Sequence, residues 1–163
     1  MLELKDVSVV FNEGTVNEKV ALNNINLALD KGDFVTIIGS NGAGKSTLFQ
    51  AISGAVDTKR GNIILNGRDI TFEPEYKRSK GIGRLFQDPL KGTAPNMTIE
   101  ENLHLSNQRG KHFSLSLMSH RHREEFKKAL MELELGLEER LDSKVGLLSG
   151  GQRQALTLLM ETL

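Results

Sequence analysis

The chain has 163 residues, which is enough for one globular domain and too few for two of ordinary size. Its 21 lysine and arginine residues balance 21 aspartate and glutamate residues, so no overall field draws it toward nucleic acid or an anionic membrane. It contains no cysteine, which excludes a disulfide framework and a thiolate metal site.

The first residues have the alternating pattern of β-strands. Apolar residues alternate over 2–11, with a slip of register near Asp6, and they alternate again over 25–29. The continuous apolar run 34–38 follows a turn and is typical of a strand covered on both faces. We therefore predict two half-buried strands followed by the central strand of a sheet.

A helix, a hairpin and a further strand are expected next. Residues 45–53 carry apolar side chains one turn apart, and Gly54 is placed to cap the end of this helix. The Asn66-Gly67 pair after an apolar run predicts a hairpin. The short apolar run 82–86 predicts another strand.

Beyond Pro89 the pattern becomes helical. Thr98 and Glu101 have the spacing of a capping box, in which each side chain binds an exposed amide at a helix start. A second helix is predicted by three- and four-residue apolar spacing at Phe126, Leu130, Leu133 and Leu137. We find no linker or repeat and expect one compact unit.

A glycine-rich loop lies between the predicted central strand and the predicted helix. Its residues are Gly39, Ser40, Asn41, Gly42, Ala43, Gly44, Lys45 and Ser46, which fit the Gly-x4-Gly-Lys-Ser pattern. Glycines let the backbone amides curl around a polyphosphate. Lys45 adds a cation for the β- and γ-phosphates, Ser46 a hydroxyl ligand for Mg²⁺, and Thr47 a donor for an α-phosphate. The loop predicts a nucleoside triphosphate site.

A second motif starts another helix. Ser149 and Gln152 have capping-box spacing, and Gly150 and Gly151 between them weaken a helix unless a phosphate approaches closely. With Leu148 and the residues that follow, this stretch resembles the signature sequence of ATP-binding cassette (ABC) proteins.

This resemblance implies a fold and a shared site. The fold would be α/β, of the P-loop NTPase type of ABC ATPases, with an N-terminal antiparallel β portion, a helical subdomain and an incomplete core sheet. Two ATPase subunits, as a homodimer or heterodimer, would face each other head to tail. Lys45 of one and Ser149, Gly150, Gly151 and Gln152 of the other would then enclose one ATP with its Mg²⁺.

The resemblance also suggests roles for two further residues. Gln87 lies where the family has a glutamine that touches Mg²⁺ and the attacking water, although a glutamine after a strand is more often a plain surface residue. Phe11 resembles the aromatic residue that stacks on adenine, but a core phenylalanine explains it equally well.

The helical part carries a cluster of basic residues. It contains Arg109, Lys111, Arg121, Arg123, Lys127 and Lys128, with His112, His120 and His122 among them. Because acidic residues interrupt it and aromatic residues do not interleave it, we interpret it as a solvated face and expect no nucleic-acid partner.

The catalytic carboxylates of the family have no counterpart in the sequence. An ABC cassette continues after the signature into a strand ending in Asp-Glu and then to a histidine, whereas this sequence has no Asp-Glu pair and its four histidines precede the signature. We expect that these 163 residues form part of a cassette and do not hydrolyse ATP alone. The expected parts are a β portion with the P-loop core at 1–91, a helical subdomain at 92–147, and the signature at 148–163.

The expected role is energy coupling for solute transport. The sequence has no secretory signal and no apolar window of the roughly 18 to 20 residues that a membrane helix needs. We therefore expect a cytoplasmic protein, peripheral on the inner face of the cell membrane. Separate transmembrane permease subunits and a solute-binding protein would be its partners, as in bacterial importers, and residues 92–98 resemble the amino-acid type.

Two alternatives remain open. One is an ABC ATPase that acts on chromosomes or ribosomes; only 60 residues lie between Gln87 and Leu148, which leaves no room for the long coiled coil of chromosome-type members. The other is a nucleotide-binding fragment without catalytic activity.

Overall fold

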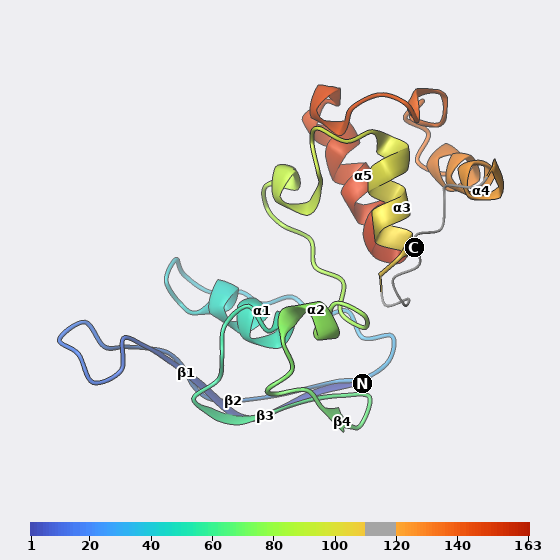
Figure 1. The fold of residues 1–163 in the computed structure, drawn as a ribbon. Coiled ribbons are helices and arrows are strands. Elements are labelled where there is room, and N and C mark those ends of the chain that lie inside the picture. Colours follow the sequence, from blue (N-terminus) through green and yellow to red (C-terminus); the bar gives the residue numbers. More distant parts are fainter. Residues whose placement is uncertain (110–119) are drawn as a thin grey trace. The chain divides into compact units, whose positions relative to one another are not determined.

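The computed structural model describes residues 1–109 and 120–163. They form two compact units, unit 1 from Met1 to Ile82 and unit 2 from Gly83 to Leu163 (Figure 1). No helix among these described residues is both long enough and apolar enough to cross a bilayer.

Unit 1 is a four-stranded antiparallel sheet in the order β2-β1-β3-β4. The strands are β1 (Leu2–Phe11), β2 (Lys19–Leu29), β3 (Arg60–Leu65) and β4 (Arg68–Asp69). Asp6 has a positive φ of 51°, and the register between β1 and its neighbours shifts beside it, as predicted. Asn66 and Gly67, with φ of 52° and 79°, form the expected hairpin turn.

Two helices lie on the same side of this sheet (Figure 1). They are α1 (Lys45–Ser53) and α2 (Glu75–Arg78), and Gly54 caps α1 in the left-handed conformation, as predicted. Leu48 and Ala51 of α1 pack into the buried apolar cluster of the sheet. The buried Arg78 guanidinium donates to the carbonyls of Ala51 at 2.7 Å and Ile52 at 3.0 Å, so it binds the end of α1.

Unit 2 is helical. Its helices are α3 (Ile99–Asn107), α4 (His120–Met131) and α5 (Gly150–Thr162), with short 3-10 turns η1 (Pro89–Gly92), η2 (Glu138–Arg140) and η3 (Val145–Leu147). The core is one apolar cluster that includes Ile99, Leu103, Phe126, Leu130, Val145 and Leu156. Helices α3 and α5 lie side by side in it (Figure 1).

Four sequence predictions differ from the structure, of which three concern two strands and the number of compact units. Residues 34–38 and 82–86 form no strand, because no partner strand pairs with them among residues 1–109 and 120–163. Phe34 is 95% exposed, which does not fit a strand covered on both faces. The described residues divide into two compact units instead of the single unit expected.

The predicted second helix is shorter than its apolar spacing suggested. α4 ends at Met131, and Glu134 and Gly136 adopt positive φ of 53° and 66°, which no helix continues through. Leu137 therefore lies outside the helix, although it is fully buried in the same core cluster.

Candidate functional site

The glycine-rich loop of unit 1 leads directly into α1. Gly42 and Gly44 have positive φ of 83° and 88°, a region that L-residues with side chains rarely adopt. A Cβ on Gly44 would lie 2.6 Å from the carbonyl oxygen of Ala21 in β2. The backbone therefore passes so close to the sheet at Gly44 that only glycine fits.

Lys45 folds back over this loop. Its Nζ donates to the carbonyl oxygens of Gly39 at 2.6 Å and Ser40 at 2.8 Å. The ammonium is thereby held where the loop backbone curls, and its three N–H donors can be shared between these carbonyls and an anion. The arrangement gives the loop a fixed positive charge.

The start of α1 offers backbone donors to the same place. Its N-cap is Gly44, which has no side chain to cap the helix, and no acidic residue lies in the first turn. The first amides of a helix have no partner inside it, and the helix dipole adds positive potential there. Together with Lys45, these amides can bind a phosphate group. Ser46 is exposed at this helix start, where its hydroxyl can serve as an oxygen ligand.

Phe11 lies at the end of the sheet nearest to the loop. It pairs with Lys19 across the first hairpin, and Ala21, two residues farther along β2, is the residue that approaches Gly44. Two strand residues span about 7 Å. The Phe11 side chain is partly buried and packs against the core of unit 1, so the position fits both the core role and a contact with a base.

The signature residues begin α5 in unit 2. Ser149 is the N-cap: its hydroxyl accepts from the Gln152 amide at 3.3 Å, and Gln152 Oε1 accepts from the Ser149 amide at 3.2 Å. The predicted capping box is therefore present. A Cβ on Gly150 or Gly151 would meet no atom within 4 Å, so both face open space.

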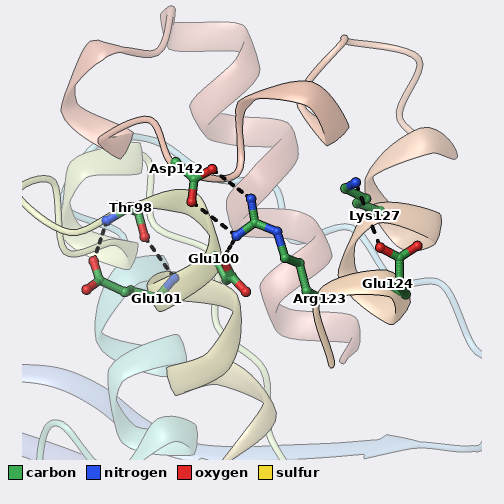
Figure 2. Close-up of polar contacts among 7 residues, drawn as sticks. All are labelled: Thr98, Glu100, Glu101, Arg123, Glu124, Lys127 and Asp142. Carbon is green, nitrogen blue, oxygen red and sulfur yellow. Dashed lines mark hydrogen bonds and ion pairs between the residues drawn. The ribbon is translucent and has the colours of Figure 1, made fainter. Parts of the chain in front are cut away.

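Hydrogen bonds hold the segment before the signature, residues 142–148, at both of its ends. Arg153, one turn into α5, donates to the carbonyls of Leu148 at 2.9 Å and Gly146 at 3.1 Å. Farther back, Arg123 of α4 donates to Asp142 at 2.7 Å and also pairs with the buried Glu100 of α3 (Figure 2). These bonds fix the approach to Ser149.

The hydrogen bond from Arg123 also lowers the pKa of Asp142. Because Arg123 bonds to both Glu100 and Asp142, its guanidinium joins α4 to α3 and to the segment before the signature (Figure 2). The Thr98 capping box predicted from the sequence lies beside it, with the Thr98 amide 2.7 Å from Glu101 Oε2 (Figure 2).

Gln87 is exposed and lies in unit 2, between residues 82–86 and η1. Asp88, the next residue, caps η1 by accepting from the Leu90 amide at 3.0 Å. The structure therefore fixes the backbone on the C-terminal side of Gln87. Its side chain belongs to the same unit as the signature, whereas the glycine-rich loop belongs to unit 1.

Most described members of the basic cluster have carboxylate partners. Arg109 pairs with Glu161, Arg121 with Glu125 and Lys127 with Glu124 at 3.8 Å (Figure 2 shows the last pair). Lys111 and His112 lie outside the described residues. These pairs reduce the positive potential of the surface, which favours the interpretation as a solvated face.

Three contributors to the site region were not predicted from the sequence. Asn102 is buried and its amide bonds both the N–H and the carbonyl of Ala94, which holds the loop before α3. Arg153 and the Arg109–Glu161 pair were missed as well. A buried polar side chain on an apolar helix face was the signal for Asn102; long-range pairs leave no pattern along the chain.

Comparisons with known proteins give a family match, similar sequences and similar folds. Residues 22–163 match the ABC transporter family. The tyrosine transport ATP-binding protein of Clostridioides difficile (strain R20291) is 41% identical over 163 residues, which are 100% of this chain and 65% of the relative. The xylose/arabinose import ATP-binding protein XylG of Sulfolobus acidocaldarius is 35% identical over 159 residues, 97% of this chain and 59% of the relative. The chain thus spans less than two thirds of the length of either relative.

A solved structure shares the fold. It is the dimeric post-hydrolysis state of the ATP-binding cassette MJ0796 bound to ADP and Pi, with a TM-score of 0.81 and 26% identity, covering 99% of this chain and 68% of that chain. The likeness confirms the predicted fold class, α/β of the P-loop ABC ATPase type.

Proposed function

The chain belongs to the ABC transporter family, and we propose that it is the ATP-binding part of a subunit that couples ATP binding and hydrolysis to solute import. The observation that carries this proposal is the glycine-rich loop, where Lys45 is folded over the carbonyls of Gly39 and Ser40 at the uncapped start of α1. The Lys45 ammonium and the uncapped helix start support phosphate binding independently of the family match.

In this proposal the loop binds the phosphates of ATP. The amides of residues 42–47 and the Lys45 ammonium direct donors toward them, while Phe11 contacts the base. The Ser46 hydroxyl would hold Mg²⁺, together with Gln87, and this cation supplies neutralisation of phosphate charge. Each of these groups acts by position and charge.

The signature would bind the same ATP from a second copy or from a related subunit. Gly150 and Gly151 have open space beside them. The first turn of α5 is capped by Ser149 and Gln152, and its dipole and remaining amides can still bind an anion. The MJ0796 cassette, which is similar to this chain, was solved as a dimer with ADP and Pi. A shared ATP makes association depend on the γ-phosphate.

Hydrolysis requires an oriented water and a group that accepts its proton. We propose that Gln87 senses the γ-phosphate and that Ser149 and Gly151 stabilise developing charge. The 163 residues contain no Asp-Glu pair of the kind that the family uses for Mg²⁺ and water. We therefore predict that these residues alone bind ATP without turnover.

The transport role is proposed from the relatives. Two of them are named for tyrosine transport and for xylose/arabinose import. Because these solutes differ in chemistry, the solute would be selected by other chains: separate membrane permease subunits and a solute-binding protein. The ATP-binding part would then act on the inner face of the cell membrane.

Calorimetric titration with MgATP tests the proposal. Lys45→Ala should weaken binding at least about tenfold, because it removes the cation over the loop. Lys59→Ala, on an exposed cation that pairs with Glu13 in the same unit, is the matched control and should leave binding unchanged. Equal affinity of the Lys45→Ala variant and the unmodified protein would contradict the proposal.

A further inference from the structure

The carboxylate of Glu161 lies near the end of α5 and receives three donors. Arg109 donates to Oε2 at 2.5 Å and to Oε1 at 2.9 Å. The backbone amide of Arg84 donates to Oε2 at 3.0 Å. A two-pronged guanidinium bond of this kind orients the carboxylate as well as binding it. Glu161 thus joins α5 to the segment that leads to Gln87.

This contact is close and largely shielded. The Glu161 side chain is 16% exposed and that of Arg109 is 29% exposed. A Cβ on Gly83 would lie 2.8 Å from Glu161 Oε2, so the carboxylate occupies the space that a side chain would need. The segment before Gln87 therefore packs directly on Glu161, although it forms no strand.

The segment after Gln87 packs on the same helix. A Cβ on Gly92, at the end of η1, would lie 2.7 Å from Cγ2 of Thr157 in α5. The segments before and after Gln87 therefore both pack against α5. The same helix begins with the signature residue Ser149. Arg84 and Gln87 are three residues apart, so a shift of the Arg84 amide is transmitted to Gln87 through little intervening chain.

We propose that Glu161 is a positioning residue that fixes the segment before Gln87 on the signature helix, so that Gln87 and Ser149 move as one body. The inference rests on the proposed function of Gln87 and the signature. Arg109 has a supporting part, because it orients the carboxylate that accepts from Arg84. Nothing in this arrangement requires Glu161 to touch the nucleotide.

Kinetics of the complete subunit in its transporter can separate positioning from a purely structural role. Glu161→Ala should lower kcat by about 10- to 100-fold, because small misplacements near a reacting group are costly. KM for ATP should stay within about twofold, since unit 1 carries the phosphate loop. Glu161→Gln retains an oxygen acceptor for Arg84 and serves if the alanine variant folds poorly; it should lie between Glu161→Ala and the unmodified protein. Glu125→Gln removes an exposed ion pair of α4 and is the matched control.

A double-mutant cycle with Gln87→Ala gives the decisive comparison. If Glu161 acts through Gln87, its replacement has almost no further effect on kcat in the Gln87→Ala background. The same fold-loss in both backgrounds would overturn the proposal, and so would a Gln87→Ala variant with unchanged kcat. Failure of the proposed function is recognised separately, by turnover that survives Lys45→Ala.

Hydrogen exchange supplies a readout that does not depend on turnover. The Arg84 amide should exchange at least about tenfold faster in Glu161→Ala than in the unmodified protein, because its acceptor is lost. Glu125→Gln should leave that rate unchanged. An Arg84 amide equally protected in Glu161→Ala and in the unmodified protein would contradict the proposal.

Discussion

Unit 1 and unit 2 each expose a helix start that carries glycine, at Gly44 before α1 and at Gly150 and Gly151 in α5, but they stabilise it differently. At the start of α1 the N-cap is Gly44, and no side chain takes up the first amides. At the start of α5, Ser149 and Gln152 exchange two hydrogen bonds in a capping box. The first helix start is left open to an anion, whereas the second is stable without one.

The structural reason for glycine also differs between the two motifs. Gly44 has a positive φ of 88° and lies against the Ala21 carbonyl, so the fold of unit 1 itself requires it. Gly150 and Gly151 are not among the positive-φ glycines of the described residues, and both face open space. Glycine is thus required inside unit 1, but in the signature it leaves room for another molecule.

The largest effect expected from this comparison is in unit 1. Gly44→Ala should destabilise the unit by about 2 to 5 kcal/mol, from left-handed strain and a collision with the Ala21 carbonyl. Gly42→Ala has the strain without the collision and should cost roughly 1 to 2 kcal/mol. Urea denaturation followed by Tyr76 fluorescence reports on unit 1, because Tyr76 is the sole tyrosine and the chain has no tryptophan. Equal losses for the two variants would show that the collision is unimportant.

A smaller loss is expected when the cap of α5 is removed. Ser149→Ala should cost about 1 kcal/mol, because it removes the acceptor for the Gln152 amide. Thr98→Ala removes the equivalent cap of α3 and should cost a similar amount. Far-UV circular dichroism during urea denaturation follows these helices. No change with Ser149→Ala would mean that its hydroxyl does not cap the helix in solution.

The signature glycines should give an effect of opposite sign. Gly151→Ala should stabilise α5 by about 0.5 kcal/mol, since alanine loses less backbone entropy in a helix and meets no atom here. The same change should weaken ATP-dependent association if a phosphate approaches this position. The same denaturation assay measures the first effect. Destabilisation would indicate that the glycine serves the fold of unit 2 after all.

The smallest expected effect is on the loss of thermal stability at acidic pH. The Arg123 hydrogen bond lowers the pKa of Asp142, and bonds from Thr71 lower the pKa of Asp69 in unit 1. A lowered carboxyl pKa contributes stability above its ordinary value, near 3.8, that is lost as the pH falls through the folded-state pKa. Asp142→Asn should therefore flatten the fall of Tm between about pH 5 and pH 2.5. If Tm falls with pH in Asp142→Asn as steeply as in the unmodified protein, the lowered pKa of Asp142 does not contribute to stability.

Features set by neighbours in the chain could be predicted from the sequence. The bounds of α1 with its Gly54 cap, the turn at Asn66-Gly67 and both capping boxes depend on residues a few positions apart. The slip of register near Asp6 was visible as a break in alternation. In the same way, the phosphate-loop motif predicted a curled, glycine-rich backbone that leads into a helix, and Gly42 and Gly44 adopt positive φ there.

Features set by distant residues could not be predicted. An apolar run such as 34–38 indicates a strand, but a strand also needs partners, which no local pattern reveals. The spacing from Phe126 to Leu137 matched a helix, yet Gly136 interrupts it and Leu137 reaches the core from a loop. The Arg109–Glu161 pair joins residues 52 positions apart, and its Arg84 contact joins residues 77 apart.

Sedimentation of the complete subunit with MgATP or MgADP tests most directly the central claim, that the loop of one chain and the signature of another enclose one ATP. We predict a shift from monomer to dimer with MgATP, no shift with MgADP, and no dimer for Ser149→Arg, whose cation would oppose Lys45 of the partner chain. A profile that MgATP leaves unchanged, or a dimer that survives Ser149→Arg, would contradict it.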